Sequence, residues 1–220
     1  MLPCCATSSR RPNTPRQGAS FVTTKALRVG VFREDLDALH APPHPLLLEI
    51  EQRAIADGVP LVSRQTGRLL STLVTAMQAS RILDVRTAYG DATLWMALAQ
   101  PRMGKIWTME SNLDRAEIAQ SYFRRAGEDD FIEIFSTPAL EQLDNFPHRS
   151  LDIAFVADDV TLYDRYFDLI MPMLKLSGFA IFDRALLASD AFLQRFLQHP
   201  QLATILLPLG DGIAVGARRE

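Results

Sequence analysis

Acidic side chains end or follow four apolar segments of this 220-residue chain, and their chemistry depends on whether those segments meet. Carboxylates at such positions accept hydrogen bonds from sugar hydroxyls, take up protons as general bases, or hold a hard divalent cation. If the segments are parallel strands of one sheet, their carboxyl ends lie at the edge where ligands bind. The acids concerned are Asp84, Glu110, Asp158, Asp159 and Asp183.

The segment 80–99 carries the clearest signal. Its apolar run Ile82–Val85 meets a turn and then an apolar, helix-like run, which is typical of a strand–turn–helix site for a nucleotide-type cofactor. Such a turn usually has a glycine directly after the strand, and here that residue is Arg86. The segment indicates a nucleotide-binding scaffold. Because of Arg86, we do not expect this protein to bind such a ligand in the usual way.

Glu110 closes the segment 105–109, about 24 residues beyond the end of the first apolar segment. An acid there commonly accepts both ribose hydroxyls of a nucleotide. The alternative is a helix-start residue facing the positive end of the next helix dipole, and spacing favours the ribose interpretation. The carboxylates after the segments 151–156 and 179–182 suit a divalent cation and equally suit solvated loops, so spacing leaves both readings open.

Composition bounds the class of protein. A net charge of −3 gives no support for general nucleic-acid binding, and no apolar run approaches the length of a membrane span. The adjacent Cys4 and Cys5 predict a reducing, cytoplasmic compartment and no cysteine-built metal site. The four histidines lie far apart, so none is assigned a catalytic role.

The pattern along the chain predicts a disordered tail over residues 1–24 and one α/β domain over residues 25–220. Alternating segments indicate a Rossmann-like, seven-stranded, mostly parallel sheet with helices on both faces and an antiparallel pair at the C-terminal end. Expected helices are 46–56, 66–79, 92–99, 113–126, 138–143 and 161–174. Expected strands are 81–85, 105–109, 131–135, 151–156, 179–182, 203–207 and 212–217.

From about Pro45 to Arg218, a series of short motifs resembles one family when taken in order. The chain is similar to class I S-adenosylmethionine-dependent O-methyltransferases of the caffeoyl-CoA and catechol type. The resemblance implies S-adenosylmethionine as the cofactor, a small hydroxylated acceptor and a homodimer. The matching segments are 46–51, 62–63, 67–70, 79–85, 87, 90, 93–97, 108–110, 116–119, 123–127, 138–140, 163, 166 and 206–212.

The resemblance also implies a map of the site, position by position. Val62 and Ser63 would flank the methionine part of the cofactor, and the turn 84–90 would wrap its amino-acid end. Glu110 would hold the ribose. The residues of that turn with assigned roles are Asp84, Arg86, Thr87 and Gly90; Pro138 and Ala139 would lie beside the adenine, and Asp183 would be a metal ligand.

Several departures from the family pattern fall on the chemistry. The first metal ligand is replaced by Ala157, and the lysine near the substrate hydroxyl by Val160. The asparagine that follows Asp183 in the family is Arg184, and the Tyr-Ser pair that opens the helix is Asp91-Ala92. These changes leave little to hold a dication, so the divalent metal of the family is not expected.

Two arginines leave alternatives open. Arg184 either substitutes for the cation and binds an anionic group of the substrate, or pairs with a nearby carboxylate, and the second is favoured because arginine beside carboxylates usually pairs with them. Arg86 either intrudes on the cofactor, at a cost of about 1–3 kcal/mol if its backbone is strained, or reaches the carboxylate of the methionine moiety with Asp91 orienting it.

Three functional hypotheses follow. The first is a methyltransferase that acts on a small hydroxylated acceptor without the usual metal, with Asp158 or Asp159 as general base. The second is a degenerate scaffold that binds or regulates without turnover. The third, metal-dependent catalysis with Asp158 as the replacement ligand, is the least favoured. Acceptor choice is expected to lie in the loops 27–45 and 186–191.

Overall fold

The computed structural model describes residues 37–219. The predicted tail over residues 1–24 and the first residues of the predicted domain, 25–36, lie outside this range, as does Glu220. Within the described range, no helix is long and apolar enough to cross a membrane.

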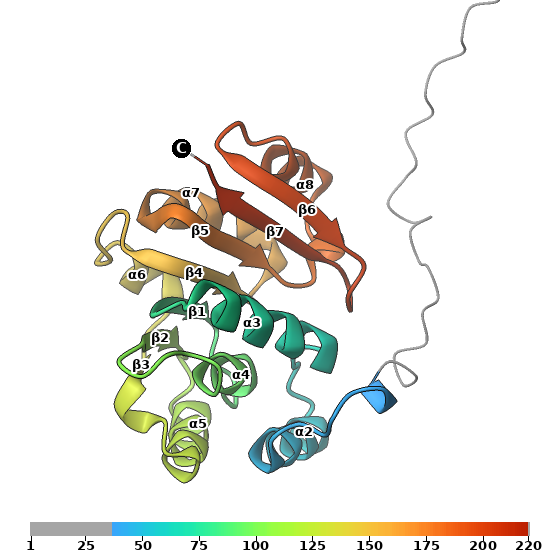
Figure 1. Ribbon diagram of the computed structural model, residues 1–220, viewed down its shortest axis with the longest axis vertical. Coiled ribbons are helices and arrows are strands. Elements are labelled where there is room, and N and C mark those ends of the chain that lie inside the picture. The colour runs from blue at the N-terminus through green and yellow to red at the C-terminus, as the bar shows by residue number, and fades with distance from the viewer. Residues whose placement is uncertain (1–36, 220) are drawn as a thin grey trace, which may run out of the picture.

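A seven-stranded sheet forms the centre of the molecule, with the strand order β3-β2-β1-β4-β5-β7-β6 (Figure 1). The five strands from β3 to β5 pair in parallel, whereas β7 runs antiparallel to both β5 and β6. The predicted mostly parallel sheet with an antiparallel C-terminal pair is therefore confirmed. The strands are β1 (Arg81–Val85), β2 (Lys105–Met109), β3 (Ile132–Phe135), β4 (Leu151–Val156), β5 (Leu174–Phe182), β6 (Leu202–Leu207) and β7 (Ile213–Arg218).

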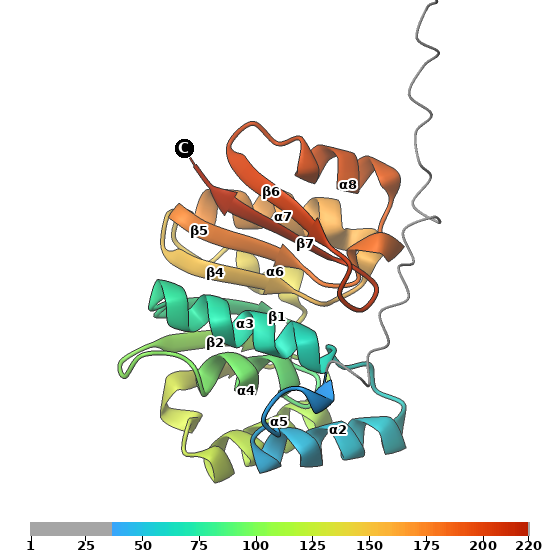
Figure 2. The same ribbon diagram turned by 45° about the vertical axis from the view of Figure 1, so that its right-hand side comes forward.

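Helices cover both faces of the sheet, as Figures 1 and 2 show from two directions. One face packs against α2 (Pro45–Asp57), α3 (Arg64–Met77), α4 (Asp91–Ala97) and α5 (Leu113–Ala126). The other packs against α6 (Ala139–Leu143), α7 (Tyr163–Met173) and α8 (Asp190–Leu197). The described residues also form the short 3-10 helices η2 (Asp129–Phe131), η3 (Val160–Leu162) and η4 (Ala185–Leu187).

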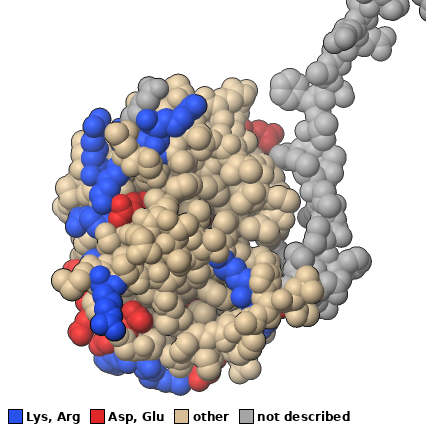
Figure 3. Space-filling model, viewed as in Figure 1, with Lys and Arg blue, Asp and Glu red and all other residues tan. Residues whose placement is uncertain are grey.

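Alternation along the strands supplies the two cores. In β1, Ile82 packs with the helices α2–α5, while its neighbours Leu83 and Val85 pack with α6–α8, because successive side chains of a strand point to opposite faces. All three are fully buried. On the face drawn in Figure 3, charged side chains lie mainly near the margin and the middle carries mostly uncharged residues.

Local capping signals set the ends of several helices. The Ser63 hydroxyl accepts a hydrogen bond from the Thr66 amide at 3.0 Å, so α3 begins two residues before the predicted start. Gly58 ends α2 in the left-handed region with φ of 66°, as its position after the helical pattern predicts.

The main difference from the expected elements is α8. Residues 186–191 are expected to form a variable loop, but Ala191 lies in α8 and Leu186 in η4. The Ser189 hydroxyl caps α8 by accepting from the Phe192 amide at 3.1 Å, and the buried Phe192 and Phe196 form its inward face. This helix has eight residues, and so few positions give only a weak periodic pattern.

Candidate functional site

The strand ends meet at one level at the carboxyl edge of the sheet. Val85 at the end of β1 is in register with Met109 of β2 and Val156 of β4, and Val156 is in register with Phe182 of β5. Strand order reverses between β1 and β4, because later strands are added on the opposite side. This is the switch point at which sheets of this kind bind ligands.

The turn after β1 has an unusual backbone. Arg86, Ala88 and Gly90 have φ of 86°, 49° and 88°, all in the left-handed region. A Cβ atom on Gly90 would lie 2.5 Å from the ring of Phe123, so packing as well as conformation requires glycine there. Thr87 anchors the turn to β2, because its amide donates to the Met109 carbonyl at 2.8 Å.

Glu110 holds the same turn from β2. Its Oε2 accepts a hydrogen bond from the Ala88 amide at 2.9 Å, and its Oε1 accepts one from the Asn112 amide at 2.9 Å. Its side chain is buried, and Asn112 is the N-cap of α5. Each carboxylate oxygen has a further lone pair, so these contacts leave acceptor capacity for a ligand.

Asp84 has one carboxylate oxygen without a partner. Oδ2 accepts a hydrogen bond from the Thr93 hydroxyl at 2.5 Å, whereas Oδ1 is buried and accepts none. Burial raises the pKa of Asp84 to about 7, and the hydrogen bond from Thr93 opposes that rise. Such an unpaired buried atom calls for an explanation, and a ligand that donates to it is one.

Arg86 spans two segments. Its Nη2 donates to the Pro60 carbonyl at 3.3 Å, in the loop that leads to Val62 and Ser63. Its Nε is buried without a partner. Burial lowers the pKa of Arg86, the charge of Arg184 adds to that lowering, and the acids Asp158, Asp84 and Glu110 oppose it. These residues are thus gathered in one site.

Asp91, which one sequence-based alternative assigns to orienting Arg86, also lies at this site. Burial raises its pKa to about 8, with the charge of Glu51 adding to the rise and the backbone of Val62 opposing it. Asp91 forms no ion pair with Arg86. Val62 and Ser63 are half-buried beside this turn, and the Ser63 hydroxyl is used to cap α3.

Asp158 and Asp159, adjacent at the end of β4, have different environments. Asp158 is half-buried and its Oδ2 accepts a short hydrogen bond from the Tyr166 hydroxyl of α7. Asp159 is exposed, and its Oδ1 accepts from both the amide and the hydroxyl of Thr161 at 2.9 Å. Asp159 is the N-cap of η3, and this hydrogen bonding lowers its pKa.

Arg184, directly after Asp183 at the end of β5, does not form the expected pair with a nearby carboxylate. Its Nη2 donates to the backbone carbonyls of Ala157 at 2.8 Å and Asp158 at 2.7 Å, and it forms no ion pair with a carboxylate of residues 37–219. The backbone of Arg184 has φ of 50°, in the left-handed region. The neighbouring Asp183 is buried, which raises its pKa to about 6.

A divalent metal does not fit the residues at these two strand ends. Position 157 offers a methyl group, and position 184 offers a guanidinium that already donates to the carbonyls there. In the part of the chain that the structure describes, no three His, Cys, Asp or Glu side chains group so as to hold a metal ion. Asp183 therefore lacks the partner ligands that a hard cation requires.

The residues expected beside an adenine lie at the end of β3. Pro138 is exposed and Ala139 is half-buried at the start of α6. Just before them, the Thr137 hydroxyl is buried without a partner.

Unpaired polar atoms concentrate at this edge. Of the seven buried side-chain nitrogen and oxygen atoms without a hydrogen-bond partner in the described chain, four belong to Asp84, Arg86, Thr137 and Arg184. They lie at or just after the ends of β1, β3 and β5, so a ligand lying across the strand ends would satisfy them.

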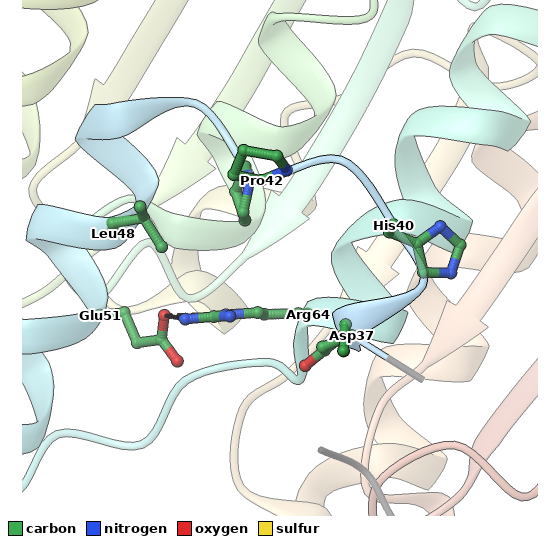
Figure 4. Close-up of a pocket in the computed structure, with 8 residues that line it drawn as sticks. Asp37, His40, Pro42, Leu48, Glu51 and Arg64 are labelled. Atoms are coloured by element: carbon green, nitrogen blue, oxygen red, sulfur yellow. Dashed lines mark hydrogen bonds and ion pairs between the residues drawn. The ribbon is translucent and has the colours of Figure 1, made fainter. Parts of the chain in front are cut away.

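A separate pocket of about 670 Å³ lies on the side of α2 and α3 (Figure 4). Figure 4 shows Arg64 pointing toward Glu51, and the Arg64 Nη2 lies 2.7 Å from a Glu51 carboxylate oxygen. Part of the wall of this pocket comes from residues between 37 and 43, which fall within the loop 27–45 expected to govern acceptor choice. The pocket is lined by Asp37, Ala38, His40, Pro42, Pro43, Leu48, Glu51 and Arg64.

Comparison with known proteins gives a consistent result. Residues 43–219 match the model of a family described as O-methyltransferase. A catechol O-methyltransferase of Mycobacterium tuberculosis is 28% identical over 177 residues, covering 72% of this chain and 80% of that protein. A methyltransferase of Geobacter sulfurreducens has a solved structure with a TM-score of 0.78 and 25% identity, covering 85% of this chain and 94% of that one. An O-methyltransferase of Bacillus cereus, solved in complex with SAH, shares the fold with a TM-score of 0.74 and 22% identity, covering 85% and 96%.

Proposed function

The chain belongs to the O-methyltransferase family, and from this premise we propose that it transfers a methyl group from S-adenosylmethionine to a small hydroxylated acceptor without a divalent metal. The nature of the acceptor and the independence from metal are the parts of the proposal that go beyond the family. Each rests on residues at the carboxyl edge of the sheet.

The observation that carries the cofactor assignment is the pair Asp84 and Arg86. Asp84 lies near the end of β1 and Arg86 directly after it, they form no ion pair, and each has a buried atom without a partner in the described chain. The amino-acid end of S-adenosylmethionine carries an ammonium and a carboxylate. Asp84 Oδ1 would accept from the ammonium, and the Arg86 Nε–H would donate to the carboxylate.

Other residues extend this assignment along the edge. Glu110 would accept from the ribose hydroxyls, while the Thr137 hydroxyl would bond to the adenine that Pro138 and Ala139 flank. Val62 and Ser63 would lie against the methionine chain, with Thr87 and Gly90 keeping the turn in shape. The order of these contacts follows the strand order from β1 through β2 to β3.

The reaction needs little chemistry from the protein, because the bound cofactor supplies a methyl group activated by its sulfonium. The acceptor oxygen forms the new C–O bond as the S–C bond breaks, and the electron pair of that bond stays on sulfur. The hydroxyl proton goes to Asp158, which Tyr166 holds in place. Asp158 suits the role of base better than Asp159, whose carboxylate caps η3.

The proposed independence from metal rests on the donor atoms present. Ala157 and Arg184 occupy positions where the family resemblance implies ligands, and the guanidinium supplies a fixed positive charge of its own. Proximity and orientation then have to supply the acceleration that a metal would otherwise provide.

Calorimetric titration tests the cofactor assignment. S-adenosylmethionine and S-adenosylhomocysteine (SAH) should bind in the micromolar range in the presence of EDTA. 5′-Methylthioadenosine, which lacks the amino-acid end, should bind at least about tenfold more weakly, since it cannot satisfy Asp84 and Arg86. The proposal fails if neither SAH nor S-adenosylmethionine binds.

Arg86 also supports a second candidate, a degenerate scaffold that binds or regulates without turnover. Its guanidinium joins Pro60 to the turn, between two segments expected to flank the methionine moiety. If it blocks the site, Arg86→Gly should create SAH binding that the natural chain lacks. If it serves the carboxylate, Arg86→Gly should weaken existing binding by about tenfold, and Arg86→Lys should restore part of it.

A homodimer, implied by the family resemblance, and a cytoplasmic location, predicted from Cys4 and Cys5, remain predictions. Sedimentation of the purified chain and imaging of the tagged full chain would test them separately.

A further inference from the structure

Among residues 37–219, Arg184 is a cation that hydrogen bonds hold in place and that forms no ion pair. Its Nη2 contacts two backbone carbonyls, while its Nε is buried without a hydrogen-bond partner in the described chain. Its backbone is held in the left-handed region, which a residue other than glycine seldom adopts. Carbonyl oxygens orient a guanidinium but do not neutralise its charge.

None of the three nearby carboxylates forms an ion pair with Arg184. Asp158 turns its carboxylate to the Tyr166 hydroxyl, and Asp159 turns its own to Thr161. Asp183 is buried one residue before Arg184 and forms no ion pair with it. A second cation, Arg86, is close enough for the two charges to influence each other, and the acids Asp158, Asp84 and Glu110 act on Arg86 in the opposite sense. Arg184 itself keeps a buried Nε–H that no group of the described chain accepts, so it can donate to an anionic group of a ligand.

The position of Arg184 indicates which ligand this is. In the proposed function, the cofactor lies over the ends of β1, β2 and β3. Arg184 follows β5 and contacts the end of β4, which lie on the other side of the switch point. That side is left for the acceptor.

We propose that the acceptor carries a carboxylate in addition to its reacting hydroxyl, and that Arg184 binds this carboxylate; the inference rests on the proposed function. The planar guanidinium matches a carboxylate better than it matches a neutral hydroxyl. Arg184 thus acts in acceptor specificity, in the place where the family resemblance implies a metal ligand.

The test uses two ligands that differ by one carboxylate, catechol and 3,4-dihydroxybenzoate. Each is titrated in EDTA into the full chain already saturated with SAH. The natural chain should bind 3,4-dihydroxybenzoate at least about tenfold more tightly than catechol. Arg184→Gln should abolish this preference, and Arg184→Lys should keep part of it, because lysine retains the charge but lacks the planar fork.

Arg195→Gln is the matched control, since Arg195 lies in α8 and pairs with Asp164 and Asp168 on the surface. Equal binding of the two ligands by the natural chain overturns the inference, as does failure of 3,4-dihydroxybenzoate to bind. A preference that survives in Arg184→Gln also overturns it. If Arg184→Gln does not fold, the natural chain and Arg184→Lys decide the matter. Failure of SAH to bind in the first step instead overturns the proposed function.

Discussion

The Nη2 atom of Arg184 lies 2.7 Å from the carbonyl oxygen of Asp158, so a side chain that follows β5 fixes the backbone at the end of β4. The same atom also donates to the Ala157 carbonyl. This arrangement places a permanent positive charge beside the half-buried carboxylate of Asp158 without forming an ion pair. The proposed acceptor side of the site therefore carries the positive charge of Arg184. The proposed cofactor side carries the carboxyl group of Asp84 and the guanidinium of Arg86.

Substitution of Asp84 tests the cofactor side. Asp84→Asn should weaken SAH binding by about 10- to 100-fold, because the ammonium loses a charged acceptor. Binding of 5′-methylthioadenosine should change by less than about threefold, since it has no ammonium. Calorimetry of both ligands measures the difference, and Asp130→Asn is a surface control. Equal losses for both ligands would show that Asp84 acts only through the structure of the turn.

The same residue predicts a pH dependence of SAH binding. Burial raises the pKa of Asp84 to about 7 in the unliganded protein, so its carboxyl group is largely protonated at pH 6 and ionised at pH 8. Affinity for SAH should therefore rise between pH 6 and pH 8, and Asp84→Asn should reduce that rise. A natural chain that binds SAH equally well at both pH values would contradict the proposed ammonium contact.

Gly90 provides a test of the turn itself. Gly90→Ala should lower the free energy of unfolding by about 2–4 kcal/mol, since the new Cβ meets the Phe123 ring and the backbone stays left-handed. Gly127→Ala is the control, because Gly127 has φ of 73° but no atom within 4 Å of its Cβ position. It should cost only about 1 kcal/mol. Denaturant unfolding measures both, and equal losses would contradict the packing argument.

Asp91 should make the stability of the unliganded protein depend on pH. Burial raises its folded-state pKa to about 8, whereas the unfolded value is about 3.9. Between these values the folded state holds more protons than the unfolded state, so the contribution of Asp91 to stability falls as pH rises and levels off above about pH 8.

Asn cannot ionise, so Asp91→Asn removes this contribution. Relative to the natural chain, the variant should gain at least about 1.4 kcal/mol of unfolding free energy between pH 5 and pH 8, the equivalent of one pKa unit. Thermal and urea unfolding at both pH values give this difference. Asp130→Asn should show none, and an advantage of Asp91→Asn that shrinks with rising pH would refute the explanation.

Much of the fold was predictable because period-two and helical patterns repeat in long segments. The bounds of β1, β2, β4 and α5 agree with the predicted ranges. β5 begins at Leu174, five residues before its predicted start, because exposed residues in its first half hide the strand pattern. The acids at the strand ends were also predicted to meet, since parallel strands bring their carboxyl ends to one edge.

Side-chain partners were less predictable. The sequence favours a carboxylate partner for Arg184 because such pairs are common, but its guanidinium donates to two backbone carbonyls. The sequence does not distinguish Asp158 from Asp159 as the general base. The structure does, because Asp158 accepts a hydrogen bond from Tyr166 whereas Asp159 accepts one from Thr161. The unpaired atoms of Asp84 and Thr137 depend on the packing around them, which no local pattern encodes.

The most direct test of methyl transfer without metal is the initial rate of SAH formation from S-adenosylmethionine and 3,4-dihydroxybenzoate. The rate should be the same, within about twofold, in EDTA and in added magnesium, because Ala157 and Arg184 offer no ligands for the ion. Asp158→Asn should lower it by about 100-fold or more in both conditions, since the proton acceptor is lost. A rate that is abolished by EDTA and restored by magnesium would contradict the account.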